Sequence, residues 1–367
     1  MRNTFAAVSA LALAAGSAHA GGVERTTQSI AIIFETGNYA ELTFGSVTPK
    51  VSGVGAGTVP SPLQPTPGVP SGDMAADYTQ LSFGVKTQIN DSLDIGLVID
   101  QPFGADVSYP LTGYYASGSV AELNSTAITG IARYKLPNNV SLLAGLRYQT
   151  LEATASIPFI GGYTVNGEKD GGVGYLVGIA YEKPEIALRV ALTYNSSIKH
   201  KLATTEIGGL TSTTPIETPQ SVNLEFQSGV AKDTLVFGSI RWVEWSKFVI
   251  DPANYPPTSA LVSYDNNTTT YTLGVGRRFS ESWSGAVSLS YEKSNGGFSS
   301  NLGPTDGRLG VTIGATYTKD NMKITGGVSY VDIGDAETTL AAASGVPAGE
   351  FRNNRAVGVG VRVGFSF

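Results

Sequence analysis

Cysteine is absent from this chain of 367 residues, and only two histidines occur in it. Without cysteine there can be no disulfide framework, thiolate metal site or thiol nucleophile. His19 lies in a leader that we expect to be cleaved, and we expect His200, which stands between two lysines, to be solvated rather than catalytic. The chain also lacks a G-x-S-x-G elbow and a nucleotide-binding glycine motif. We therefore expect no enzyme activity, no catalytic residue, no metal site and no cofactor.

No run of about 18 apolar residues follows the amino terminus, which excludes a helical membrane protein. Charged residues make up only 15% of the chain, and the mean hydropathy is +0.03. Such a near-neutral average is typical of strands with an apolar outer face and a polar inner face. The leader contains one of the 24 basic and none of the 30 acidic residues, so the mature net charge is 23 − 30 = −7. This acidic balance argues against nucleic acid as a partner.

The first 20 residues predict a secretory signal peptide. Arg2 supplies the positive charge, residues 5–15 form a short apolar core, and Ala18-His19-Ala20 offers a cleavage site. A buried amino-terminal helix, the alternative, does not account for these flanks. We expect three segments: a signal peptide (1–20), a short amino-terminal hatch or plug (21–37) and a membrane-embedded domain (38–367).

The last strand carries the clearest signal of fold. From Phe351 onward, one set of alternate positions includes Val357, Val359 and Val361, whereas the other contains Gly, Ser and Arg362. Since successive side chains on a strand point to opposite faces, this strand has one apolar face and one polar face. The same alternation recurs along the chain and favours a closed barrel with lipid outside and water inside.

Short turns and long loops alternate between the predicted strands. We expect the long loops at 49–76, 104–119, 157–172, 203–218, 249–264, 295–306 and 334–349. About fourteen strands result, an even number with two lengths of connection, as in bacterial outer-membrane proteins. The predicted fold is all-β: a transmembrane antiparallel up-and-down β-barrel with a short amino-terminal plug.

Aromatic residues lie near the predicted strand ends, where girdles at the two membrane interfaces are expected. They are Tyr134, Tyr148, Tyr181, Tyr194, Trp242, Trp283, Tyr291, Tyr317 and Phe367. The alternative is a large soluble β-sandwich or propeller, which the leader and the missing blade repeat argue against. We expect a monomeric, multi-pass protein in the outer membrane of a Gram-negative bacterium.

If the apolar set faces lipid, the basic side chains of the strands face the lumen. They include Lys86, Arg133, Lys135, Arg147, Arg189, Arg241, Arg278, Arg308, Lys323 and Arg362. A lipid-facing arginine near the midplane costs about 2–4 kcal/mol, so this orientation needs no ligand to explain it. The alternative is that Arg133, Arg147, Arg189 and Arg241 bind the carboxylate of an anionic amphiphile, which suits the forked guanidinium.

Four short segments, in the order in which they follow one another along the chain, resemble those of a known family. They are Asp100-Gln101-Pro102-Phe103-Gly104 with the residues to Tyr109, Arg133-Tyr134-Lys135-Leu136 before Asn138-Asn139, Lys199-His200-Lys201-Leu202, and Arg241-Trp242-Val243-Glu244-Trp245-Ser246. Together with the terminal Phe367, they span most of the mature chain. In these segments the chain resembles the FadL/TodX (OMPP1) family of outer-membrane transporters for long-chain fatty acids and other hydrophobic compounds.

The resemblance implies a plugged barrel whose extracellular loops capture the ligand. It also implies that a kink in the third strand, at Pro102, Phe103 and Gly104, opens a lateral path to the membrane. The family's hatch usually carries an Asn-Pro-Ala motif near its start, and residues 21–37 contain none. The expected plug is therefore short.

A fatty acid must cross a polar lipopolysaccharide layer, which requires apolar surface on the outer loops and in the lumen. Phe103, Tyr114, Tyr115 and Phe159 are candidates for that surface, because exposed apolar loop residues are otherwise a liability. We expect passive uptake of hydrophobic compounds, above all long-chain fatty acids, with release through the barrel wall into outer-membrane lipid beside lipopolysaccharide. The alternatives are a general diffusion porin with an open lumen and a structural or adhesion barrel.

Overall fold

The computed structural model describes residues 22–57, 66–256, 260–340 and 345–367. The predicted signal peptide, residues 1–20, lies outside the described residues. The described chain is built almost entirely of strands, which confirms the all-β prediction. No helix in these ranges is long and apolar enough to cross a membrane.

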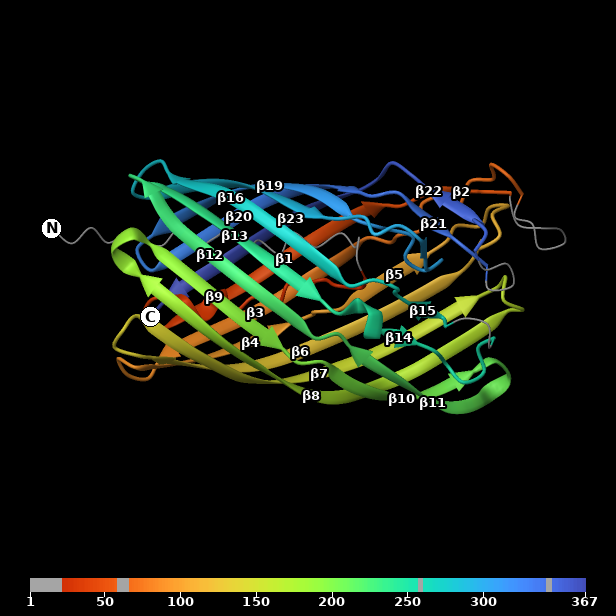
Figure 1. Cartoon of the computed structure of the whole chain (residues 1–367), viewed down its shortest axis with the longest axis horizontal. Helices are drawn as coiled ribbons and strands as arrows, with labels where there is room; N and C mark the ends of the chain where they lie inside the picture. The colour runs from red at the N-terminus through yellow and green to blue at the C-terminus, as the bar shows by residue number, and fades with distance from the viewer. Residues whose placement is uncertain (1–21, 58–65, 257–259, 341–344) are drawn as a thin grey trace.

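The main strands form a closed antiparallel barrel (Figure 1). Closure comes from β1 (Tyr39–Lys50), which pairs with β3 (Tyr78–Gln88) on one side and with β23 (Asn354–Ser366) on the other. The rest of the wall is β4 (Leu93–Asp100), β5 (Gly104–Ser108), β6 (Val120–Lys135), β7 (Val140–Ile157), β8 (Tyr163–Lys183), β9 (Leu188–Asn195), β10 (Ile198–Glu206), β11 (Leu210–Thr218), β12 (Ser221–Ala231), β13 (Thr234–Val243), β16 (Thr268–Arg278), β17 (Trp283–Glu292), β19 (Arg308–Lys319) and β20 (Met322–Ile333). We call each crossing of the wall a stave. Three staves consist of two strands each (β4 with β5, β9 with β10, β11 with β12). These seventeen strands therefore make fourteen staves, in agreement with the prediction.

The remaining elements are short. Two small sheets add to the loops: β14 (Val249–Ile250) with β15 (Val262–Ser263), and β2 (Gly53–Gly55), β18 (Phe298–Ser299), β21 (Ala336–Thr338) and β22 (Gly349–Phe351). The 3-10 helices are η1 (Ala31–Phe34), η2 (Pro184–Ile186), η3 (Ile207–Gly209) and η4 (Trp245–Lys247).

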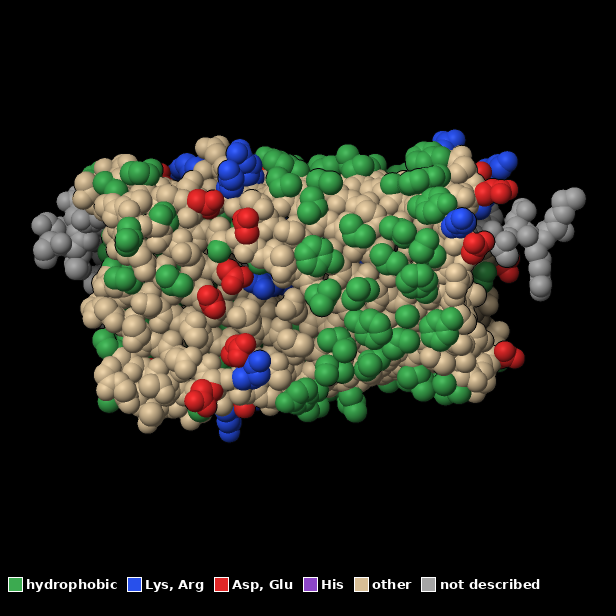
Figure 2. Space-filling view, turned by 180° about the vertical axis from the view of Figure 1, so that it is seen from behind, with side chains coloured by type: hydrophobic (Ala, Val, Ile, Leu, Met, Phe, Trp, Pro, Cys, Tyr) green, Lys and Arg blue, Asp and Glu red, His purple; other side chains and the backbone are tan. Residues whose placement is uncertain are grey.

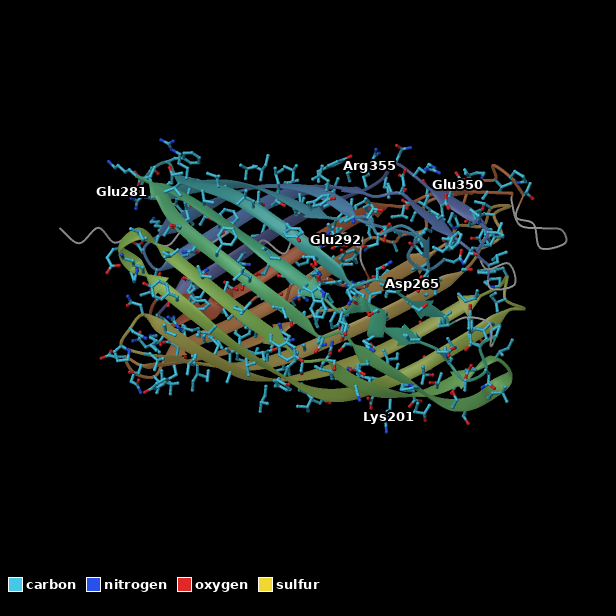
Figure 3. All side chains as sticks on the ribbon, viewed as in Figure 1. Lys201, Asp265, Glu281, Glu292, Glu350 and Arg355 are labelled. Carbon is cyan, nitrogen blue, oxygen red and sulfur yellow. The ribbon has the colours of Figure 1, made fainter. Side chains whose placement is uncertain are left out.

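The two ends of the barrel differ in their connections. The carboxyl terminus and the short turns lie at one end, called the turn end, and the long connections lie at the other, called the loop end (Figure 1). Glu281 marks the turn end and Glu350 the loop end in Figure 3. In bacterial barrels the short turns face the periplasm and the long loops face outward.

Side chains of the wall alternate between the two faces as the sequence predicts. Val357, Val359 and Val361 are 42%, 48% and 47% exposed on the outside. Arg362 lies on the inner face, where its guanidinium is 3.7 Å from the carboxylate of Glu41. Apolar side chains gather in a band over the half nearer the turn end, with charged side chains at both borders (Figure 2). This band has the arrangement of a lipid-facing belt, and the loop-end half extends beyond it.

Two predicted loops are mostly strand. The regions 157–172 and 203–218 form the ends of the β7–β8 and β10–β11 hairpins. Their outer faces carry polar residues such as Thr164, Asn166 and Thr213, because the wall here rises above the apolar belt. The apolar-out alternation that marks the membrane strands is therefore lost, although the inner face keeps buried residues such as Val165 and Leu202.

Two single-residue expectations are wrong. The last strand begins at Asn354, and Phe351 lies in a separate strand with its side chain fully buried; the chain turns at Asn353, whose φ is +58°. His200 is 1% exposed rather than solvated. It lies on β10, where strand alternation sends His200 inward and its neighbours Lys199 and Lys201 outward.

Residues 22–37 lie inside the barrel. Ile30 and Ile33 are 1% and 0% exposed and pack against wall residues Ile131, Leu143 and Leu176. Polar contacts hold Glu35 and Gly37 to the wall. Lys323 pairs with Glu35 (2.7 Å), and Lys86 Nζ donates a hydrogen bond to Gly37 O (2.7 Å). The segment thus contributes apolar core within the lumen.

The belt assignment predicts the cost of placing a charge at Val361. Val361→Arg is expected to destabilise the folded barrel by about 2–4 kcal/mol, because the guanidinium would face acyl chains. Val361→Leu, which keeps the face apolar, is the control and is expected to change stability by less than about 1.5 kcal/mol. Urea unfolding in lipid vesicles measures both, and equal stability of the two variants would contradict the belt.

Candidate functional site

The third stave of the wall is interrupted at residues 101–103. β4 ends at Asp100, β5 begins at Gly104, and both strands pair with β6. Ser125 of β6 holds the break: its Oγ accepts a hydrogen bond from Phe103 N (2.8 Å) and donates one to Phe103 O (2.6 Å). Pro102 has no N–H to add to a ladder. The predicted gating residues Pro102, Phe103 and Gly104 therefore all lie at or beside an interruption of the wall.

Residues 23–25 lie beside this break as a short antiparallel partner. Gly104 N donates a hydrogen bond to Val23 O (2.8 Å), and Arg25 N donates one to Pro102 O (2.8 Å). The amino-terminal segment therefore pairs with backbone that the interrupted stave leaves open.

The side chains of this partner segment point in opposite directions, as on any extended chain. Glu24, which forms a β-bridge with Phe103, pairs with the buried Arg241 of the lumen. Arg25 pairs with Asp106 of β5. One residue thus ties the segment to the interior and the next ties it to the wall.

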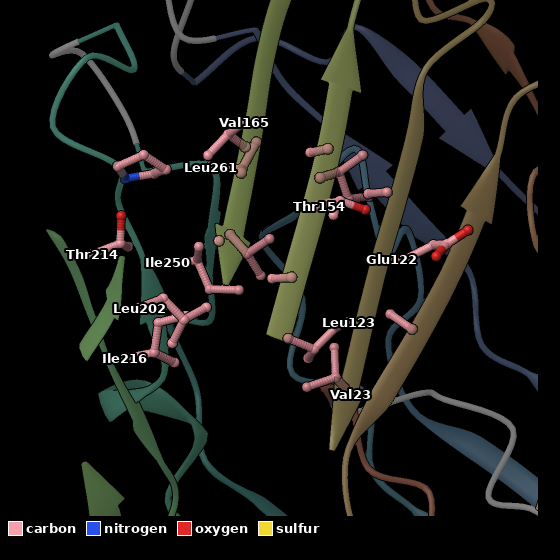
Figure 4. A pocket seen from close by; sticks show the side chains of 18 of the residues that line it. Val23, Glu122, Leu123, Thr154, Val165, Leu202, Thr214, Ile216, Ile250 and Leu261 are labelled. Carbon is pink, nitrogen blue, oxygen red and sulfur yellow. The ribbon is translucent and has the colours of Figure 1, made fainter. Parts of the chain in front are cut away.

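An apolar cavity lies in the loop-end half of the lumen, beside Val23 (Figure 4). Leu202, Ile216 and Ile250 converge on it. Among the described residues that line it, none is Lys, Arg or His. Glu122 lies at its margin with the carboxylate turned away from the apolar side chains (Figure 4). The space suits an uncharged or alkyl group.

A second apolar cavity adjoins the first. Both are lined by Val23, Ala105, Val107, Tyr264 and Leu302. Ala105 and Val107 belong to β5, directly after the break, and Val23 is one of the residues that pair with it. The cavities therefore border the interrupted part of the wall.

Aromatic residues link the break to the described part of the loop 249–264. The ring of Tyr264 contacts Trp245 (centroids 5.4 Å apart) and Phe248 (6.0 Å). Trp245 in turn meets Phe103 edge-to-face at 5.9 Å. Trp245 is 1% exposed. It contacts both Phe103 at the break and Tyr264, which lines the first cavity.

Glu206, at the end of β10, anchors that loop. Its carboxylate accepts hydrogen bonds from Tyr163 Oη (2.6 Å), Ser212 Oγ (2.8 Å) and Asn254, through N (3.0 Å) and Nδ2 (2.9 Å). Burial alone raises the pKa of Glu206, but these hydrogen bonds outweigh it and hold the pKa below its ordinary value. The ionised carboxylate strengthens each bond.

Three of the predicted ligand-contact aromatics pack together near the loop end. The rings of Tyr114 and Tyr115 lie 4.3 Å apart, and Tyr115 meets Phe159 edge-to-face at 5.5 Å. Tyr115 Oη is hydrogen-bonded to Asn301 and Thr338. The fourth, Phe103, lies apart from them and packs with Trp245. Other residues supply the described lining of the two cavities.

Of the four predicted arginines, two lie toward the turn end. The guanidinium groups of Arg133 and Arg189 each lie 4.7 Å from the ring centroid of Phe34. Arg133 also pairs with Glu182 and lies 3.7 Å from Asp94. Both are engaged by the amino-terminal segment or by wall carboxylates.

The other two arginines lie nearer the break. Arg147 Nε donates to Thr129 Oγ1 (2.9 Å). Arg241 pairs with Glu24, and its Nη1 donates to Ser221 Oγ (3.1 Å) and to Asn223 Oδ1. The structure thus separates the four arginines into two groups and brings neither into the described lining of the cavities.

The sequence reasoning missed Val23, Glu24, Arg25 and Glu206. The first three show no alternation of apolar and polar residues that would predict a strand. Their contacts are with residues far along the chain. One signal could have found Arg25: it is the only basic residue in 21–37. Glu206 was hidden because its hairpin was predicted as a loop.

Glu206→Gln is expected to weaken the attachment of Asn254 by about 1–3 kcal/mol, because the ionised acceptor is lost. Hydrogen exchange at the Asn254 amide should be faster at neutral pH, whereas Glu217→Gln, a neighbour on the outer face of β11, should leave it unchanged. Since the folded pKa is lowered, the stabilisation is present above the ordinary value of 4.5 and is lost as the pH falls through the lower folded value. Equal Asn254 exchange in wild type and Glu206→Gln at pH 7 would contradict the anchor.

Solved structures of three bacterial proteins are among those with a similar architecture. A Pseudomonas aeruginosa FadL homologue matches with a TM-score of 0.75 and 16% identity over 92% of each chain. The Pseudomonas putida toluene transporter TodX matches with a TM-score of 0.64 and 13% identity over 96% of this chain and 97% of its own. The Ralstonia pickettii toluene transporter TbuX gives 0.59 and 12% over 91% and 90%. At these identities the likeness establishes the fold.

The sequence itself matches a family model. No curated protein sequence matches the chain, but the model of the outer membrane protein transport protein family (OMPP1/FadL/TodX) matches residues 69–367. That range includes the break, β5 and most of the cavity lining. The chain therefore belongs to the OMPP1/FadL/TodX family of outer-membrane transporters of hydrophobic compounds.

Proposed function

We propose that this transporter takes up long-chain fatty acids or similarly apolar molecules at its extracellular loops and releases them through the barrel wall. The observation that carries the proposal is the position of the two apolar cavities, which share Ala105 and Val107 of the interrupted stave. A molecule in these cavities lies next to the third stave, whose ladder is broken at residues 101–103. Pro102, Phe103 and Gly104 are proposed to form the gate.

Lateral release follows from the energetics of an alkyl chain. Exposing each CH₂ to water costs about 0.8 kcal/mol, so an exit into the periplasm would oppose the movement of a long chain. A passage from an apolar cavity into the acyl region of the membrane keeps the ligand out of water throughout. No energy source is then required, and the uptake is passive.

The amino-terminal segment supports a hydrophobe channel over a general porin. Ile30 and Ile33 are buried against three wall residues in the lumen, and we propose that residues 22–37 act as a short plug. A water-filled porin would need this volume open. The protein is expected to show little steady ion conductance in planar bilayers.

The residues predicted to contact the ligand have different roles in this proposal. Phe159 packs against both apolar clusters near the cavities, so Phe159 with Tyr114 and Tyr115 is proposed to form the entry surface. Phe103 is proposed to contact ligand at the exit. Arg133, Arg147, Arg189 and Arg241 remain candidates for a ligand carboxylate only where their present partners are released.

Filling the first cavity provides a test. Ala153→Phe is expected to lower the uptake of oleate and toluene several-fold, because the added ring occupies space that Ala153 lines. Leu146→Phe is the matched control, since Leu146 is 69% exposed on the outside of the barrel. Initial uptake of each radiolabelled compound is measured in intact cells that lack a channel of this kind. Wild-type protein that speeds neither compound would overturn the proposed function, and an Ala153→Phe protein as active as wild type would remove the cavity from it.

A further inference from the structure

Two exposed cations lie directly opposite each other on the outside of the barrel. Lys50 ends β1 and Arg355 lies near the start of β23, and the two are cross-strand partners in the ladder that closes the barrel. Like charges in this position destabilise a sheet. Arg355 has Asp332 of β20 as its partner on the other side, but among the described residues neither Lys50 nor Arg355 forms an ion pair. The two cations therefore present positive charge to whatever surrounds the wall.

The pair lies at the loop-end border of the apolar belt. Val357 is the apolar residue of the outer face of β23 that lies nearest the loop end. Arg355 occupies the next outward position, about 7 Å further along the strand. Figure 3 shows Arg355 on the outside of the barrel, between Glu281 at the turn end and Glu350 at the loop end. Because the loop end faces outward, this is the level of the headgroups of the outer leaflet.

A polar surface groove begins at Lys50 and leads toward the loop end. Ser52, Asp73, Arg352 and Asn353 contribute to its described lining. The strands β2 and β22, which also line it, lie near the loop end in Figure 1. Hydroxyl, carboxylate and amide groups are the partners that sugar hydroxyls need for hydrogen bonding. From the membrane outward, the wall thus offers an apolar face, two cations and a polar groove.

We propose that Lys50 and Arg355 bind a phosphate group of lipid A, the phosphorylated disaccharide lipid of lipopolysaccharide, and that the groove receives its sugar. The Cα atoms of opposed residues are about 4.5–5.5 Å apart, so both side chains can reach one phosphate. Arginine contributes a forked donor pair and lysine a compact charge, and both suit phosphate oxygens. A phospholipid carries phosphate at the same level but has no disaccharide to fill the groove. The site lies outside the lumen and is independent of the transported molecule.

Removing the two charges tests the site without measuring transport. Lys50→Gln with Arg355→Gln is expected to weaken the binding of diphosphoryl lipid A at least tenfold, because two cations at the headgroup level are lost. Native mass spectrometry of the lipid-stripped protein in detergent measures the affinity. Lys199→Gln with Lys201→Gln is the matched control: it removes two exposed cations of β10, where Lys199 is opposite Glu217, and should change the affinity less than twofold. Equal binding by wild type and the Lys50/Arg355 variant, both folded by their heat-modifiable gel mobility, would overturn the site.

Three other ligands distinguish the sources of phosphate. Dephosphorylated lipid A and phosphatidylglycerol should each bind the wild-type protein at least tenfold more weakly than diphosphoryl lipid A, and millimolar inorganic phosphate should not displace bound lipid A. Dephosphorylated lipid A that binds equally well would remove phosphate from the proposal. Equal affinity for phosphatidylglycerol would overturn lipid A as the occupant, and displacement by inorganic phosphate would assign the cations to a free anion. None of these results bears on the proposed function, which the uptake measurements test.

Discussion

A sheet that crosses hydrocarbon must pair its backbone donors and acceptors within itself, because lipid offers no substitute. This barrel meets the requirement by closing β1 onto both β3 and β23. Its third stave departs from the requirement at residues 101–103, where Pro102 removes a donor. Ser125 satisfies one side of that break with its hydroxyl, and the amino-terminal segment satisfies the other with its backbone. The wall is therefore completed by a piece of chain that is not continuous with it.

The lumen is divided into layers of different character. The loop-end half holds the apolar cavities, and the carboxylates and guanidinium groups of Glu24 and Arg241 lie next to the break. Ile30 and Ile33 fill the next layer, and an ionic cluster around Asp94 and Arg133 lies toward the turn end. Apolar ligand is favoured in the first layer and opposed by the charged ones beyond it. This order of layers supports the proposed exit through the wall.

The barrel was predictable because its cause is local. Each membrane stave repeats apolar and polar residues with period two, and Val357 to Arg362 lie as that pattern requires. Where the wall leaves the membrane the pattern fades, so the sequence predicts loops at 157–172 and 203–218, where the structure has hairpins. The contacts of Arg25 at the site could not be predicted, for another reason. Its partners Tyr78 and Asp106 are 53 and 81 residues away. No period in the sequence encodes such a contact, and Gly104 shows its need for a small residue only once Arg25 is placed over it.

Val23 lines both apolar cavities and also accepts a hydrogen bond from Gly104 of the interrupted stave. Under the proposed function, a ligand in the cavities favours the opening of the wall only by binding more strongly to the opened arrangement than to the closed one. The proposed opening would offer more apolar contact, because it would join the cavities to the acyl region along Ala105 and Val107. Each buried CH₂ adds about 0.8 kcal/mol, so a few methylenes offset the loss of a neutral hydrogen bond worth about 1 kcal/mol and of a partly buried ion pair. Short polar solutes gain no such contact, so the proposed function predicts that they do not open the wall.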